Sequence, residues 1–367
     1  MKLRSIQILR GLAAFLVVYT HCICQMGVFG FGRQQRMPIS TSLGTFGVDL
    51  FFVISGFIIY HSAARLNGRK EALSFLWHRF RRINPAYYAA ILLILLTWIP
   101  SWLRHQRPPL SGMQSLSSII LLPFPGSTGS ILYQAWSLSF EWYFYLLFFG
   151  IILFRTRKKA GTIGLLIGAM VLLGLALRNY QTGVLSFYTD PVIIEFMLGV
   201  GVGFVYSRWT PGKRTAMSLL LPGILLGGTL MLTGFYDVEG IKSLQTPIPK
   251  CIHALCWGGT AAFIVGGSVF LERYATEAFF RRCRLILLLG NASYSIYLVH
   301  GLVIMLIYAF YLRVGFFLPP DLAIPVEAVI ATLGGLLFYK WVETPLLGLL
   351  KKRKNVFQPI PFPPAGT

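Results

Sequence analysis

Ten apolar stretches, each close to the length that crosses a bilayer, constrain the fold of this chain more than any other feature. A helix needs about 20 predominantly apolar residues to span a hydrocarbon core. The stretches cover residues 5–26, 44–64, 83–103, 132–154, 160–177, 190–206, 216–234, 251–271, 285–312 and 323–345. Since lipid offers backbone polar groups no water, such segments form helices. The sequence therefore predicts an all-α polytopic membrane helix bundle of about ten transmembrane helices.

The distribution of basic residues predicts how these helices are threaded through the membrane. The chain has 33 Lys and Arg against 12 Asp and Glu, although only 12% of its residues are charged. With the amino terminus in the cytoplasm, 23 of the 33 basic residues fall on the cytoplasmic side, which is the side where Lys and Arg are normally enriched. Both termini are therefore predicted to be cytoplasmic. The scatter of the charges between apolar stretches argues against nucleic-acid binding.

One membrane domain is expected to fill residues 1–350, followed by a basic and then proline-rich cytoplasmic tail at residues 351–367. The first stretch starts like a signal peptide, but Arg10 interrupts it and no small-residue cleavage site follows, so a retained helix is predicted. The loop at residues 104–131 is expected to contain a short interfacial or re-entrant piece. The five cysteines are expected to be free thiols, and no metal site is expected.

Arg10 and His21 lie inside the first apolar stretch, where ionisable residues are costly and therefore candidates for function. They are eleven positions apart. On a helix this spacing places the two side chains within about 20° of one face and about 16 Å apart along the axis. The alternative is a snorkelling arginine and a hydrogen-bonded core histidine.

Asp49 lies in the run GVDLFFVISGF, at a depth in the second helix similar to that of His21 in the first. A carboxylate at that depth needs a partner. If Asp49 accepts a hydrogen bond from one ring nitrogen of His21, the other nitrogen becomes more basic, which suits a general base. A helix-capping or structural aspartate is the alternative.

Arg79, Arg81 and Arg82 form a cluster at the expected start of the third helix, just before Pro85. Proline is tolerated in the first turn of a helix. Arginines that converge with a helix amino terminus bind phosphate groups. The alternative is a charge cluster that only sets the topology.

Glu141 lies deep in its helix, beside Trp136, Trp142 and Tyr143, and is expected to orient an acceptor hydroxyl or to pair with an arginine. Glu195 in the sixth helix is a similar but less specific case.

Ser293, Tyr297 and His300 form one polar stripe on the ninth helix, because they are spaced by four and three residues. The stripe is interpreted either as hydrogen bonding within the bundle or as part of a substrate path. Glu343, near the cytoplasmic end of the last helix, is expected to pair structurally with the arginine cluster.

These motifs together resemble the acyltransferase-3 family of integral membrane acyltransferases. The likeness rests on the spacing of Arg10 and His21, GVDLFFVISGF, Arg79 and Arg82 followed by Ile83 and Pro85, WSLSFEW, SYSIYLVH and VETP. They span nearly the whole chain in the family's order. One departure is that many members have a basic residue before the proline of the last motif.

The resemblance implies transfer of an acyl group, usually acetyl, from cytoplasmic acyl-CoA to a hydroxyl of a cell-surface or exported polysaccharide, or of a lipid-linked oligosaccharide, in a bacterial inner membrane. The chain looks most like short exopolysaccharide-modifying members. It implies His21, Asp49 and Glu141 as catalytic residues and Arg10, Arg79 and Arg82 as coenzyme A ligands. Acceptor-binding roles are implied for Trp136, Ser137, Tyr297 and His300.

Two other functions are compatible with intramembrane charges. One is a transporter or flippase for a glycan or lipid-linked substrate, which the lack of a visible inverted repeat disfavours. The other is an acyltransferase that acts on a small molecule.

Overall fold

A computed structural model describes residues 3–28, 42–104, 110–123, 130–177, 183–233 and 247–351. Within these ranges all regular secondary structure is helical, and ten helical spans are long and apolar enough to cross a membrane. The all-α bundle of about ten spanning helices is therefore confirmed. The tail at residues 352–367 lies outside the described residues, and the orientation of the termini stays a prediction.

The spans consist of the following helices, with α7 and α8 together forming the sixth span and α14, η2 and α15 the tenth. They are α1 (Arg4–Val28), α2 (Ser42–Ala63), α3 (Arg69–Leu103), α5 (Ala135–Leu153), α6 (Lys159–Ala176), α7 (Gly183–Tyr188), α8 (Ile193–Tyr206), α9 (Lys213–Leu232), α11 (Pro247–Leu271), α13 (Arg284–Val314), α14 (Pro320–Phe338), η2 (Tyr339–Glu343) and α15 (Thr344–Lys351). The shorter helices are α4 (Gly112–Ile120), η1 (Glu272–Tyr274) and α12 (Glu277–Arg282).

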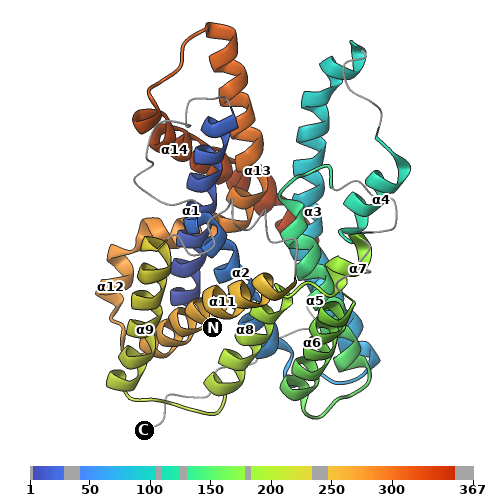
Figure 1. Cartoon of the computed structure of the whole chain (residues 1–367), viewed down its shortest axis with the longest axis vertical. Coiled ribbons are helices and arrows are strands. Elements are labelled where there is room, and N and C mark those ends of the chain that lie inside the picture. Colours follow the sequence, from blue (N-terminus) through green and yellow to red (C-terminus); the bar gives the residue numbers. More distant parts are fainter. Residues whose placement is uncertain are drawn as a thin grey trace.

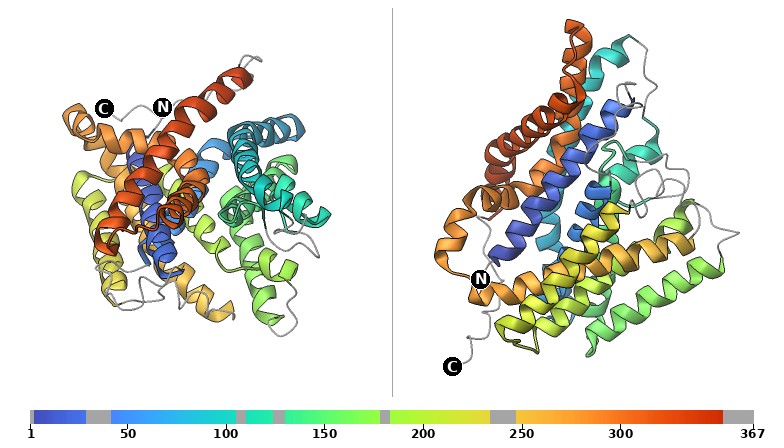
Figure 2. Two further views of the ribbon diagram at one scale, coloured as in Figure 1. Left: turned by 90° about the horizontal axis from the view of Figure 1, so that it is seen from above. Right: turned by 60° about the vertical axis from the view of Figure 1, so that its left-hand side comes forward.

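Helix α1 is packed inside the bundle, against α2, α13 and α14 (Figure 1). It lies alongside α13 in both views of Figure 2. Helix α2 continues the packing to α8, and α11 contacts α2, α8 and α9. Helices α3 and α5 pack together on the other side of the bundle, where α4, α6 and α7 also lie (Figure 1). The amino-terminal helix is thus a structural member of the bundle.

Glycines allow α1 to approach α13 and α2 to approach α8 closely. A Cβ atom added at Gly290 of α13 would lie 1.8 Å from the Gln7 carbonyl oxygen of α1. One added at Gly199 of α8 would lie 2.0 Å from the Val53 carbonyl oxygen of α2. Backbone contact through small residues is the usual basis of helix packing in membranes. These contacts fix the relative positions of α1 with α13 and of α2 with α8.

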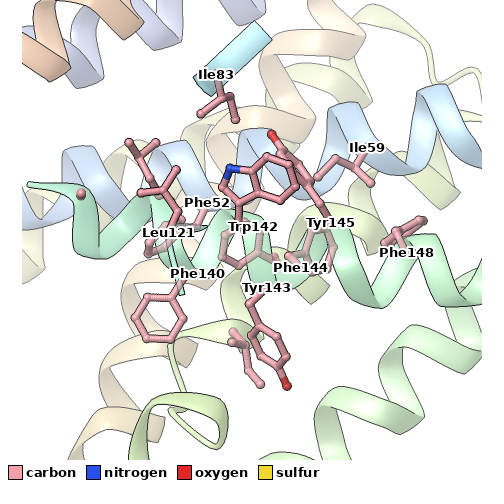
Figure 3. Packing of buried hydrophobic residues seen from close by; sticks show 14 of the residues in the cluster. Phe52, Ile59, Ile83, Leu121, Phe140, Trp142, Tyr143, Phe144, Tyr145 and Phe148 are labelled. Atoms are coloured by element: carbon pink, nitrogen blue, oxygen red, sulfur yellow. The ribbon is translucent and has the colours of Figure 1, made fainter. Parts of the chain in front are cut away.

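Aromatic side chains of α5 fill the space between α2, α3 and α8 (Figure 3). The ring of Phe196 lies 4.6 Å from that of Phe52 and 4.7 Å from that of Phe144. Trp142 and Tyr145 meet edge to face with ring centroids 5.8 Å apart. Such rings bury large apolar areas with defined geometry, and the contacts of Phe52 and Phe144 with Phe196 connect α2 and α5 through α8.

The third span starts earlier than the sequence predicts. Helix α3 begins at Arg69 and continues through Pro85, so the cluster Arg79, Arg81 and Arg82 lies in the helix interior. The predicted phosphate site at a helix amino terminus is therefore wrong in that respect. Proline removes one hydrogen bond from a helix but does not have to end it. Arg79 and Arg82 line a cavity, where they can bind anions without the helix terminus.

Two further details of the helices matter for the site. Helix α4 forms within the loop that was expected to hold a short interfacial piece. The last span changes at Tyr339–Glu343 from α-helix to π-helix, and Glu343 lies within that turn. Single π-helical turns often occur at functional sites.

Candidate active site

A cavity of about 80 Å³ lies between α1, α2, α3, α5 and α13. Its wall is mostly apolar on α2, through residues such as Phe51 and Phe52, and mostly polar on the other helices. The polar lining residues are Arg10, Ser55, Arg79, Arg82, Ser137, Glu141, Tyr145, Ser293, Tyr294 and Tyr297. The cavity thus brings together most of the site residues that the sequence predicts. It combines cations, hydroxyl groups and one carboxylate in an apolar wall.

Arg79 is held by three neighbours that leave part of its guanidinium group unused. It donates a 2.6 Å hydrogen bond to Ser62 Oγ and lies 5.1 Å and 5.4 Å from the ring centroids of Phe75 and Tyr145. Its Nε is buried and makes no hydrogen bond to any of the described residues. Because a buried donor without a partner is costly, this nitrogen is suited to an anionic ligand.

The other arginines of the cluster differ in their contacts. Arg82 is exposed and lines the cavity one turn beyond Arg79. Arg81 instead donates a hydrogen bond to the carbonyl oxygen of Leu350, which ties α3 to α15. Arg10 lies on the α1 side of the cavity. Its charge interacts electrostatically with those of Arg82, Glu141 and Glu343. Arg10, Arg79 and Arg82 therefore surround one space from two helices.

Glu141 lies on the arginine side of the cavity. Its Oε1 accepts a 2.9 Å hydrogen bond from Ser55 Oγ and another hydrogen bond from the hydroxyl of Tyr145. Tyr145 also lies against Arg79. Glu141 therefore anchors the side chains that surround Arg79.

Tyr297 closes the end of the cavity that faces the histidines. Its hydroxyl lies 2.6 Å from Ser137 Oγ and donates a 2.8 Å hydrogen bond to the Gln134 carbonyl oxygen. Its ring packs against Phe51, with centroids 6.1 Å apart, and lies 5.8 Å from the ring of His300. The stripe Ser293, Tyr297 and His300 therefore runs along the cavity and ends beside it.

His21 and His300 lie together beyond Tyr297. Their ring centroids are 4.9 Å apart at an interplanar angle of 63°. Nδ1 of His21 lies 2.8 Å from the Val17 carbonyl oxygen, and Nδ1 of His300 lies 3.1 Å from the Ile296 carbonyl oxygen. A carbonyl oxygen only accepts hydrogen bonds, so Nδ1 carries the hydrogen in both rings. Nε2 of each neutral ring is then the atom that can accept a proton.

The predicted pairing of His21 with Asp49 is wrong. Asp49 Oδ1 lies 3.4 Å from Nε2 of His253 on α11, and its Oδ2 has no hydrogen-bond partner among the described residues. Glu195 of α8 lies beside them, and one ligand atom from each of the three residues falls within 4.8 Å of the others. Similar depth on two helices did not imply contact, because Asp49 faces α8 and α11. The Val17 carbonyl oxygen orients His21 instead.

Trp136 and Glu343, like Asp49 and the two histidines, are predicted site residues that do not line this cavity. For Trp136, 44% of the surface is exposed while the ring packs edge to face on Phe52 and Phe140. Glu343 is buried and accepts a 2.5 Å hydrogen bond from Ser295 Oγ, which links the π-helical turn to α13.

Sequence reasoning missed Ser55, Tyr145 and His253. Ser55 and Tyr145 are common types in apolar helices and gave no separate signal. His253 could have been found, because it is an ionisable residue inside the apolar stretch at residues 251–271.

The fold and the cavity define a multi-pass membrane protein with a buried pocket lined by arginines, and with a pair of histidines next to Tyr297 of the pocket wall. The model of the acyltransferase-3 family, described as an acyltransferase domain, matches residues 3–340. The chain belongs to this family of membrane O-acyltransferases. No solved structure matches the chain significantly.

Three relatives of this chain have descriptions that bear on its function. The exopolysaccharide production protein ExoZ of Rhizobium meliloti is 29% identical over 321 residues, covering 86% of this chain and 94% of ExoZ. The O-acetyltransferase OatA of Staphylococcus aureus is 25% identical over 364 residues, covering 88% of this chain. The matched part is 54% of OatA, so this chain spans about half of that relative's length. Protein 2 in the picA locus of Rhizobium radiobacter is 30% identical over 129 residues, covering 35% of this chain and 62% of the relative.

Proposed function

We propose that this protein transfers an acetyl group from acetyl-CoA to a hydroxyl group of an exported polysaccharide or its lipid-linked precursor. The observation that carries the proposal is the continuous arrangement of Arg82, Arg79, the cavity, Tyr297 and the histidine pair. In the predicted orientation, coenzyme A enters from the cytoplasm and the acceptor from the opposite face. The membrane would be the bacterial cytoplasmic membrane.

The arginines bind the donor. Arg79 and Arg82 take the phosphate groups of coenzyme A, and the unused Nε of Arg79 supports this role. Arg10 draws the pantetheine arm or a phosphate towards α1. An extended pantetheine is about 15 to 20 Å long, which compares with the rise of about 16 Å from Arg10 to His21 along a helix.

His21 carries out the proton transfers. Its Nε2 takes the proton of the acceptor hydroxyl while the oxygen attacks the thioester carbonyl. The C–S bond then breaks, and the coenzyme A thiolate receives the proton from the His21 imidazolium. Because the Val17 carbonyl oxygen fixes the Nδ1 hydrogen, the ring needs no aspartate to hold this tautomer. Ser137, Tyr297 and His300 orient the acceptor.

For the thioester to reach His21, the Tyr297 side chain has to move, since it lines the cavity and its ring lies against His300. If this movement takes place only when the acceptor binds, the thioester stays shielded from water until the acceptor is present.

Mass spectrometry of cell-surface glycans from strains with and without this protein tests the proposal. We expect the acetyl content of one exported polysaccharide to fall when the gene is deleted and to return with the wild-type chain. A strain complemented with His21→Gln should stay deacetylated. If no glycan changes in acyl content, the proposal that a polysaccharide is the acceptor is wrong.

A further inference from the structure

We propose that Asp49, Glu195 and His253 bind a divalent transition-metal ion that links α2, α8 and α11. The site is separate from the cavity that we assign to coenzyme A, because none of the three residues lines that cavity. The proposal does not depend on acyl transfer.

The three side chains are buried, and three of the four carboxylate oxygens lack a hydrogen-bond donor among the described residues. Their exposed fractions are 2% for Asp49, 0% for Glu195 and 8% for His253. Neither oxygen of Glu195 receives a hydrogen bond from the described residues, and neither does Oδ2 of Asp49. Burying carboxylates without such partners is strongly unfavourable.

Lysine and arginine do not supply the missing positive charge within the described part of the chain. Lys250, three residues before His253, is already paired with Asp190 at 2.6 Å. Asp49 lies 3.4 Å from His253, so the ionisable partner that the structure shows for this carboxylate is an imidazole. A divalent cation would balance two carboxylates beside a neutral imidazole.

The geometry fits a metal better than a simple ion pair. Asp49 Oδ1 and His253 Nε2 are 3.4 Å apart, which is longer than the usual N–H···O distance of about 2.9 Å. Two ligand atoms bound to one zinc ion at about 2.1 Å stand about 3.4 Å apart in a tetrahedron. One ligand atom from each of the three residues lies within 4.8 Å of the others, so Glu195 needs only a small movement to complete three ligands.

Neighbouring glycines make room for this group. Glu195 comes next to Asp49 because α2 and α8 touch at Gly199. On α11, a Cβ atom at Gly258 would lie 2.7 Å from Cγ of Glu195. Histidine with two carboxylates is a ligand set that zinc, manganese and iron(II) accept.

The main alternative is that Glu195 is protonated and shares its proton with Asp49. Glu195→Gln distinguishes the two, because the glutamine amide can donate to Asp49 as a protonated glutamate would, yet it is a poor metal ligand. Glu327→Gln is the matched control, since Glu327 on α14 is another fully buried glutamate that is not part of this cluster.

The experiment measures metal content and melting of the detergent-purified full chain. We expect roughly one equivalent of metal in the wild type and in Glu327→Gln, and little in Glu195→Gln. After chelator treatment, zinc chloride should raise the melting temperature by about 5 °C when it is in large excess over its Kd, and only in the chains that keep the site.

Two results would overturn the proposal. One is a wild-type chain without bound metal whose melting temperature does not respond to zinc or manganese chloride. The other is a Glu195→Gln chain that keeps the full metal content. If Glu195→Gln does not fold, His253→Gln takes its place in the same comparison.

Discussion

The rings of His21 and His300 meet edge to face with centroids 4.9 Å apart, and each ring has its Nδ1 next to the carbonyl oxygen four residues earlier. The two histidines come from the first and ninth spans, which pack directly on each other. Both rings are thereby oriented by their own helices, with Nε2 as the free base. This arrangement replaces the histidine and aspartate pair that sequence reasoning favoured.

Arg79 should determine affinity for the donor. Arg79→Ala removes a charge-assisted hydrogen bond worth about 1.5–3 kcal/mol, so we expect the KM for acetyl-CoA to rise about 10- to 100-fold. Steady-state kinetics with acetyl-CoA as the varied substrate provide the measurement. Arg69→Ala, an exposed arginine on the same helix, is the control and should behave like wild type. Equal KM values for Arg79→Ala and Arg69→Ala would refute a phosphate-binding role.

His300 should contribute to binding of the acceptor and not to binding of acetyl-CoA. His300→Phe keeps an aromatic ring against His21 and Tyr297 but removes Nε2. We expect the KM for the acceptor to rise about 10-fold or more, as for the loss of one buried hydrogen bond, with the KM for acetyl-CoA unchanged. A kinetic series in which both substrates are varied makes the distinction. Wild-type acceptor kinetics would mean that only the packing of the ring matters.

Gly290 should be essential for the contact of α1 with α13. In Gly290→Ala the new Cβ would lie 1.8 Å from the Gln7 carbonyl oxygen, so the helices have to separate. Overpacking of this kind destabilises by about 1–3 kcal/mol, and we expect a lower melting temperature in detergent together with lower activity. Gly161→Ala on α6, where a Cβ meets nothing within 4 Å, is the matched control and should melt at or above the wild-type temperature. Identical melting of the two variants would contradict the close packing.

The ten spans could be predicted because a bilayer imposes a length and an apolar composition on each helix. Arg10, Arg79, Glu141 and Tyr297 could be chosen from the sequence because ionisable or hydroxyl groups in apolar helices are costly, and they do line one cavity. The start of α3 at Arg69 could not be predicted, because the first turns of this helix are polar and carry no membrane signal, and because Pro85 indicates a helix start.

Which helices touch could not be predicted from spacing along single helices. His21 meets His300 because Gly290 lets α13 approach α1, and Asp49 meets His253 because α2 packs on α8 and α11. The close approach of these helices depends on glycines such as Gly290 and Gly199, and nothing in the sequence around a glycine tells which helix will pack on it. Position along each span predicts a similar depth for Asp49 and His21, but it does not predict the direction of either side chain.

Turnover of acetyl-CoA by the purified His21→Gln chain tests the account most directly. With acceptor-containing membrane extract, the wild type should transfer label from acetyl-CoA to glycan, whereas His21→Gln should be about 10²- to 10⁴-fold slower. Its melting temperature and its affinity for coenzyme A should match the wild type, since His21 does not line the donor cavity. Transfer by His21→Gln at the wild-type rate would contradict the assignment of His21 as the general base.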